Sequence, residues 1–138
     1  MAAPAFRVVQ GKTKKVYFPM PASLALVAGT LVEIASGVIS ASDDNDTQIE
    51  GILAKTYATT DSDYASAKLA PVEVPVERHV IVRTENTASF VSTDVGAEYG
   101  ISDASTVDHS DTSNKVFKVV RVISASIVEG YLKINGSY

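Results

Sequence analysis

The chain lacks cysteine and tryptophan, and only 7% of its 138 residues are aromatic. Without a thiol it can form no disulfide, no thiolate metal site and no cysteine nucleophile. A chain of this length can nevertheless form one domain whose hydrophobic core needs no covalent staples. Valine, isoleucine, threonine, serine and alanine dominate the composition, which favours β-sheet over a helical bundle.

Basic residues are scarce outside the first fifteen positions. Arg7, Lys12, Lys14 and Lys15 lie there without any carboxylate, whereas the rest of the chain carries twice as many carboxylates as cations. An acidic body argues against nucleic acid as a partner. The sequence therefore predicts an extended basic N-terminal arm over residues 1–15 and a single β-rich domain over residues 16–138.

Long apolar runs are also missing. The stretch of lowest charge, residues 16–41, contains two prolines, two glycines and Glu33, which argues against a transmembrane helix. Residues 12–28 imitate a secretory signal in outline, but Pro19 and Pro21 interrupt them. We therefore expect no membrane partner.

Three short apolar runs between residues 23 and 57 predict a compact β-meander. The expected strands are residues 30–35, 38–41 and 49–55, each bounded by residues that favour turns. Gly51 lies inside the third strand, where a glycine indicates a bulge or the close approach of another backbone.

The remaining strands are predicted from alternation and from continuous β-branched runs. Alternating valines in residues 72–82 indicate two strands or one long bent strand. Residues 87–103 predict a strand followed by an irregular or briefly helical segment. Residues 116–123 and 127–134 predict a hairpin that lies centrally in a sheet. Together these patterns predict an all-β fold, a small barrel or sandwich with an extended N-terminal arm and at most one short helix.

The acidic loop that joins the last two strands of the meander is the best candidate for a metal site. Asp44, Asp46 and Gln48 have the alternate spacing of the oxygen ligands in an EF-hand loop. The positions at which that loop needs glycine and a bidentate glutamate are Ile49 and Lys55 in this chain. We therefore predict a solvated loop, with no metal and no other cofactor.

Catalytic motifs are missing as well. The chain has no G-x-S-x-G elbow, no H-E-x-x-H, no Walker loop and no G-x-G-x-x-G. Asp108, His109 and Ser110 include the residue types of a hydrolase triad, but adjacent strand residues point apart. We predict that the protein is not an enzyme and assign no catalytic residue; Asp108 and His109 would be the place to look for one.

A family resemblance is carried by residues 24–54. They read Leu-Ala-Leu-Val-Ala-Gly-Thr-Leu-Val, then Ser-Gly-Val-Ile, then Ile-Glu-Gly-Ile-Leu-Ala. This order resembles the decoration, or cement, proteins of tailed-phage heads, including the lambda-type head decoration protein and related longer cement proteins. The similarity is strongest over residues 23–57 and weaker over residues 72–83, so it covers roughly a quarter to a half of the chain.

The resemblance implies a β-tulip-like structural virion protein that forms a homotrimer on the outer surface of the capsid and binds the major capsid protein. It also implies that the N-terminal arm grips the capsid, so that deleting residues 1–15 leaves the body folded but abolishes attachment. A longer loop at residues 59–68 and a C-terminal extension depart from the lambda-type pattern and leave a monomer or dimer open. The arm residues assigned to capsid binding are Phe6, Val8 and Val9 as apolar anchors, and Arg7, Lys12, Lys14 and Lys15 as partners of capsid carboxylates.

Two other functions fit the composition. A glycan- or ligand-binding β-sandwich would use exposed aromatic side chains, for which Tyr57, Tyr64 and Tyr99 are the candidates. The base domain of a phage head or tail fibre would need repeats or a fibrous extension, and we find neither in this sequence.

Overall fold

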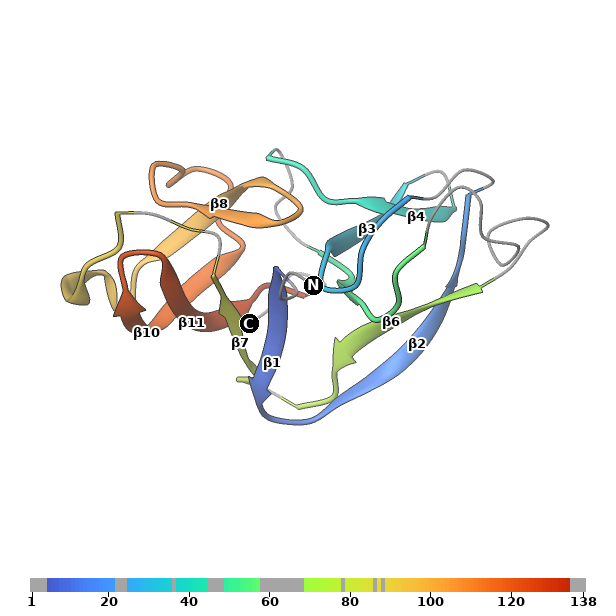
Figure 1. The fold of residues 1–138 in the computed structure, drawn as a ribbon, viewed down its shortest axis with the longest axis horizontal. Helices are drawn as coiled ribbons and strands as arrows, with labels where there is room; N and C mark the ends of the chain where they lie inside the picture. Colours follow the sequence, from blue (N-terminus) through green and yellow to red (C-terminus); the bar gives the residue numbers. More distant parts are fainter. Residues whose placement is uncertain are drawn as a thin grey trace.

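Two antiparallel β-sheets make up the described part of the molecule (Figure 1). The prediction of an all-β fold is confirmed, and the form is that of a small sandwich rather than a closed barrel. Helical structure in the described ranges is limited to one 3-10 turn, η2 (Ser92–Asp94), and these ranges contain no helix long and apolar enough to cross a membrane. The computed structural model describes residues 5–21, 25–35, 37–44, 49–57, 69–77, 79–85, 87 and 89–134.

The first sheet combines strands from both ends of the described chain. Within the described ranges its order is β1-β7-β11-β10-β8-β9. The predicted C-terminal hairpin is confirmed as β10 and β11, and it lies centrally because β8 and β7 pair with its two outer sides. The strands are β1 (Phe6–Gln10), β7 (Ile81–Thr84), β8 (Glu98–Asp103), β9 (Thr106–Asp108), β10 (Phe117–Ser124) and β11 (Ile127–Leu132).

The second sheet contains the three strands predicted between residues 23 and 57, but the predicted meander is wrong. The order of this sheet is β2-β6-β5-β3-β4 in the part of the chain that the structure describes. β3 pairs with both β4 and β5 and so lies between them, whereas a meander would place β4 in the middle; β5 is also shorter than the predicted strand. The strands are β2 (Thr13–Pro19), β3 (Leu31–Ala35), β4 (Val38–Ala41), β5 (Gly51–Leu53) and β6 (Leu69–Pro75).

Two chain segments pass together from one sheet into the other. β1 leads into β2 and β6 leads into β7, and the partners are β1 with β7 and β2 with β6. Both segments bend at the same place, at the bottom of Figure 1. Gly11 has φ +101° at this bend, and a Cβ atom on it would lie 2.9 Å from Val80 Cγ2, so glycine satisfies both the backbone angle and the space. The alternating valines of residues 72–82 are therefore divided between β6 in one sheet, β7 in the other and the bend between them.

Strand alternation sends side chains of the second sheet into two hydrophobic cores. Leu31 and Ile52 belong to the larger core, which lies against the first sheet, whereas their neighbours Val32 and Leu53 belong to the smaller one. The second sheet is thus buried on both faces around these positions. Members of the larger core from the first sheet include Phe6, Val82, Tyr99, Ile101, Phe117, Val119, Val128 and Leu132.

Residues 6–15 are part of the two sheets, which corrects the predicted arm outside the domain. β2 pairs with β6 along its whole length, and β1 pairs with β7 with one irregularity in the register at Val9. Phe6 and Val8 alternate with the cation Arg7, and this is the pattern of a half-buried edge strand, in which basic side chains take the solvent positions. Residues 1–4 lie outside the described residues.

The order of elements in residues 87–103 is the reverse of the prediction, since η2 precedes β8. The backbone nitrogen of Asp94 donates to the carbonyl of Val91 at 2.9 Å and closes the 3-10 turn, and Asp94 Oδ2 accepts from the backbone nitrogen of Val91 at 2.9 Å and caps it. Tyr99 and Ile101 then alternate into the larger core and define the strand. Gly96 before this strand and Gly100 inside it obscured its period of two.

Gly51 supports the predicted close approach of another backbone. A Cβ atom at this position would lie 2.5 Å from the carbonyl oxygen of Glu73 and 2.7 Å from Val72 Cγ1. Gly51→Ala is therefore expected to lower the free energy of unfolding by about 1–3 kcal/mol in urea titrations. Ala41→Ser, at the exposed end of β4, is the control and should change it by less than about 0.5 kcal/mol. Equal stability of the two variants would contradict the tight β5–β6 contact.

Candidate functional site

The structure places the three predicted apolar anchors in different environments. Phe6 is 1% exposed within the larger core, and Val8 packs against that core. The Phe6 side chain is not available to a partner while β1 is paired, which corrects its assignment as a capsid anchor. Val8 is only partly buried, and its assignment stays a prediction. Val9 is exposed on the same strand and is the one apolar anchor of the three that solvent reaches freely.

The four predicted basic contacts are exposed but do not form one patch. Arg7 lies on β1, opposite Arg83 of β7. Lys12 lies at the bend, where its backbone nitrogen donates to Glu77 Oε1 at 2.9 Å. Lys14 and Lys15 are neighbours on β2, so their side chains leave from opposite faces of the second sheet.

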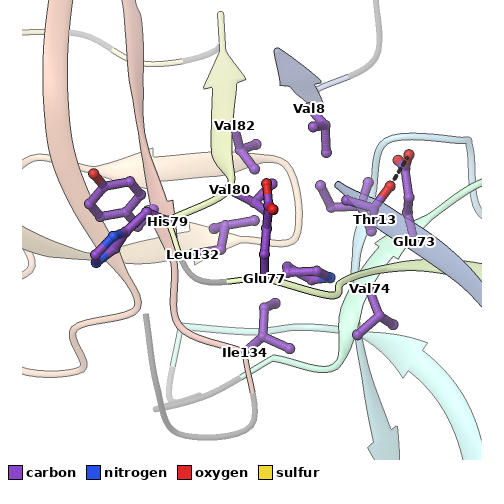
Figure 2. Close-up of a pocket in the computed structure, with 13 residues that line it drawn as sticks. Val8, Thr13, Glu73, Val74, Glu77, His79, Val80, Val82, Leu132 and Ile134 are labelled. Carbon is purple, nitrogen blue, oxygen red and sulfur yellow. Dashed lines mark hydrogen bonds between the residues drawn. The ribbon is translucent and has the colours of Figure 1, made fainter. Parts of the chain in front are cut away.

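A cavity of about 180 Å³ lies where the two sheets meet at the bend (Figure 2). Val8, Val82 and Leu132 contribute from the first sheet, and Val74 contributes from the second. The lining is therefore mostly apolar. Ligand sites usually enclose about 300–1,000 Å³, so the volume suits a single inserted side chain better than a substrate or a cofactor.

The carboxylates beside this cavity already have hydrogen-bond donors. Glu73 Oε1 accepts from Thr13 Oγ1 at 2.9 Å, a bond that Figure 2 marks, and Glu77 accepts from the backbone of Lys12. His79 has φ +63° in the bend, and its ring packs against Tyr131 at a tilt of 31°, with centroids 4.8 Å apart. These contacts hold the bend together beside the cavity.

His109 pairs with Asp94 and not with the neighbouring Asp108. Its Nε2 atom lies 3.0 Å from Asp94 Oδ2, and Tyr99 Oη donates to Asp94 Oδ1 at 2.9 Å. The rings of Phe90, Tyr99 and His109 pack together, with His109 stacked on Tyr99 at 5.1 Å between centroids. Asp108 instead accepts from the backbone nitrogen of Ser110, which closes a turn.

This cluster anchors η2 to the loop after β9. The hydrogen bond from the Val91 backbone lowers the pKa of Asp94, and those from Tyr99 and His109 lower it further against the opposing effect of burial. Burial raises the pKa of Tyr99, and its bond to the Asp94 carboxylate adds to the rise. Among the described residues, the Tyr99 hydroxyl is hydrogen-bonded to Asp94 Oδ1 and the His109 ring to Asp94 Oδ2. The arrangement therefore holds η2 and the loop after β9 together.

The acidic loop is described only in part. Asp43 and Asp44 are exposed, and Asp43 forms an isolated bridge with Asp103. Asp46 and Gln48, two of the three candidate ligands, lie outside the described residues. Elsewhere in the described ranges no group of three or more histidine and carboxylate side chains is placed to hold a metal ion.

Two of the three tyrosines proposed for a glycan site are buried. Tyr57 is 4% exposed in the smaller core, and Tyr99 is 7% exposed in the larger one. A stacking platform for a sugar needs an exposed ring face, so neither side chain can provide one. Tyr64 lies outside the described residues.

An exposed apolar patch on the second sheet was missed by the sequence analysis. Tyr17 is 57% exposed and Leu69 is 53% exposed. Tyr17 is paired with Pro71, and Leu69 with Pro19, so the four residues share one face of the β2–β6 pair. We call them the Tyr17 patch. The patch combines two strands that are far apart in the sequence, and their pairing was not evident from the sequence.

A row of charged residues across the first sheet was also missed. Arg7, Arg83, Glu129 and Arg121 are successive cross-strand partners on β1, β7, β11 and β10. We call them the arginine row. The available signal was Glu129, a lone charge inside a strand that is otherwise apolar.

Glu129 holds two of these arginines in place. It is 4% exposed. Its Oε2 atom accepts from Arg83 Nε at 2.8 Å and its Oε1 atom from Arg121 Nε at 2.7 Å. Burial raises the pKa of Glu129, but the hydrogen bonds and positive charges of Arg121 and Arg83 outweigh it, so the pKa lies below its ordinary value. The carboxylate is therefore charged at neutral pH.

In comparisons with known proteins, no protein family matches this chain and no curated protein sequence matches it.

Proposed function

We propose that this chain is a structural virion protein that binds the outside of an assembled phage capsid and stabilises the lattice of the major capsid protein. Copies of the chain associate, as a homotrimer, at their positions on the shell. The sequence resemblance over residues 24–54 is the starting point for this proposal. The strands that carry it, β3, β4 and β5, form the centre and one edge of the second sheet.

The observation that carries the proposal is the Tyr17 patch. Tyrosine and leucine side chains that are more than half exposed on one sheet face are typical of surfaces that bind other proteins. Lys15 shares this face of β2 and has Glu73 as its cross-strand partner, so the patch has a polar border. An apolar centre with a charged rim is the usual arrangement of a protein interface.

Stabilisation of the capsid follows from mass action. A protein that binds the assembled lattice and not its separated subunits stabilises the lattice by its binding free energy, repeated over many copies. Contact with several subunits at once adds to this effect because dissociation then requires all contacts to break together. No catalytic step is needed for this function.

The direct test is to mix the purified full chain with undecorated phage heads and to image the particles. The proposal expects regular extra density on the outer surface and heads that resist heating or loss of divalent ions better than bare heads. Heads without added density, across tailed phages with decoration-dependent shells, would rule the proposal out.

Tyr17→Ala is expected to weaken binding to such heads by about 30-fold, the usual scale for a central aromatic contact of about 2 kcal/mol. The measurement is the occupancy of sedimented heads as a function of protein concentration. Because the side chain is 57% exposed, the free energy of unfolding should hardly change. Val95→Ala, at a side chain that is 52% exposed beside η2, is the matched control and should bind as the unmodified chain does. An equal loss in both variants would exclude a specific role for the Tyr17 patch.

A further inference from the structure

The arginine row carries more positive charge than its own carboxylate balances. Three arginines and one glutamate form a row across four adjacent strands, over roughly 14 Å from Arg7 to Arg121, and the glutamate contacts two of the arginines. Arg7 and Arg83 are direct cross-strand partners, and like charges in that position repel. Among the described residues Arg7 has no ion-pair partner, and the Arg121 side chain is 51% exposed. The row therefore exposes positive charge to solvent. The repulsion between its arginines is unfavourable for the fold, so folding alone does not explain the row.

The fold separates the charges of the whole chain. No lysine or arginine occurs between Lys15 and Lys55, nor between Arg83 and Lys115. The strands of the arginine row come from the cation-bearing segments, whereas β4, β8 and β9 come from the segments that carry only carboxylates. The sheet places β1 at one edge and β9 at the other.

Carboxylates gather beyond the β9 edge. The end of β4 meets the end of β8 through the bridge between Asp43 and Asp103, and Asn114 Nδ2 donates to the backbone oxygen of Asp44 at 3.2 Å. These contacts bring three segments together without a lysine or arginine among them. We call this region the acidic end, and its aspartates in the described ranges are Asp43, Asp44, Asp103, Asp108 and Asp111.

We propose that the arginine row of one copy docks on the acidic end of a second copy of this chain. This deepens the proposed function, since it assigns the contact through which copies associate. The two surfaces are different parts of the molecule, so the contact is head-to-tail and produces a closed ring when its rotation closes. Glu129 fixes the directions of Arg83 and Arg121 before contact, which lowers the entropy lost when the copies meet.

Opposite charges across an interface mainly accelerate association and select the partner, and their effect falls with salt. The full chain is therefore expected to self-associate in sedimentation velocity runs at about 0.05 M salt and to dissociate as salt rises toward about 0.5 M. An acidic partner other than a second copy would leave the purified chain monomeric at every salt concentration.

Charge reversal tests each surface separately. Arg7→Glu and Asp44→Lys are each expected to weaken self-association at least about tenfold. A mixture of the two variants should associate again, because the reversed row of one faces the reversed acidic end of the other. Lys14→Glu changes net charge as Arg7→Glu does but lies on β2, so it should associate like the unmodified chain. Arg7→Glu also removes the repulsion from Arg83, and its thermal midpoint should not fall.

Three results would overturn the inference: a monomeric unmodified chain at low salt, an equal loss in Lys14→Glu, or no recovery in the mixture. Binding of the chain to phage heads is measured separately from these sedimentation experiments. A chain that decorates heads but is monomeric in solution would refute the contact and leave the proposed function in place. A chain that self-associates as described but does not bind phage heads would refute the proposed function and leave the contact between copies in place.

Discussion

Phe6→Ala is expected to destabilise the protein by about 3–5 kcal/mol, the usual cost of removing a buried phenylalanine. Phe6 is 1% exposed and packs in the larger core, and its backbone nitrogen donates to the carbonyl of Gly29 at 3.1 Å. The loss approaches the whole stability of a typical domain. Chemical denaturation followed by circular dichroism would measure it.

The matched control is Val9→Ala on the same strand. Val9 is 37% exposed, so its truncation should cost less than about 1 kcal/mol. If both variants had similar stability, β1 would behave as an arm and not as a strand of the sheet. By the same reasoning, deletion of residues 1–15 is expected to unfold the domain, since it removes β1 and the first part of β2.

Glu129→Gln is expected to lower the free energy of unfolding by about 2–4 kcal/mol at neutral pH. The substitution keeps the size of the side chain but leaves Arg83 and Arg121 without their shared anion. Arg121 is half exposed and water can solvate it, which places the cost below that of a fully buried pair. Glu98→Gln, at a half-buried carboxylate on β8, is the control and should have a small effect.

The stabilisation of the fold by the Glu129 carboxylate should decrease as pH falls. The folded protein holds the pKa of this carboxyl below its ordinary value of 4.5, so the unfolded chain takes up the proton first as pH falls. The stabilisation is then complete above that ordinary value and is lost as pH falls through the folded-state pKa. Urea midpoints of the unmodified protein and of Glu129→Gln should therefore converge in acid. A constant difference down to the lowest accessible pH would show that the carboxylate is not the source of the stabilisation.

Much of the fold follows from local pattern. The three strands β3, β4 and β5, the C-terminal hairpin and the close approach at Gly51 are evident because alternation, turn residues and a strand glycine are properties of neighbouring residues. The order β5-β3-β4, in place of the predicted meander, is not a local property. The pairing of residues 6–15 cannot be predicted from local pattern, since their partners lie in residues 69–84. A short strand with alternating cations looks the same in sequence whether it is paired or not.

The surfaces were harder to predict than the strands. Tyr17 and Leu69 are separated by about fifty residues of sequence, and only the β2–β6 register places them on one face. The arginine row requires the register of four strands to be known together. His109 shows the same limit, because its partner is Asp94 on another loop and not the adjacent Asp108.

The paired passage of two segments between the sheets also bears on how the chain folds during synthesis. β1 and β2 are made before the other described strands, yet Phe6 must wait for Thr84 before it has a cross-strand partner. The core of the first sheet further needs β10 and β11, which are made after the other described strands. β1 and β2 therefore remain unpaired until residues 69–84 have been made, and folding is dominated by long-range closure, a slow step in β-proteins.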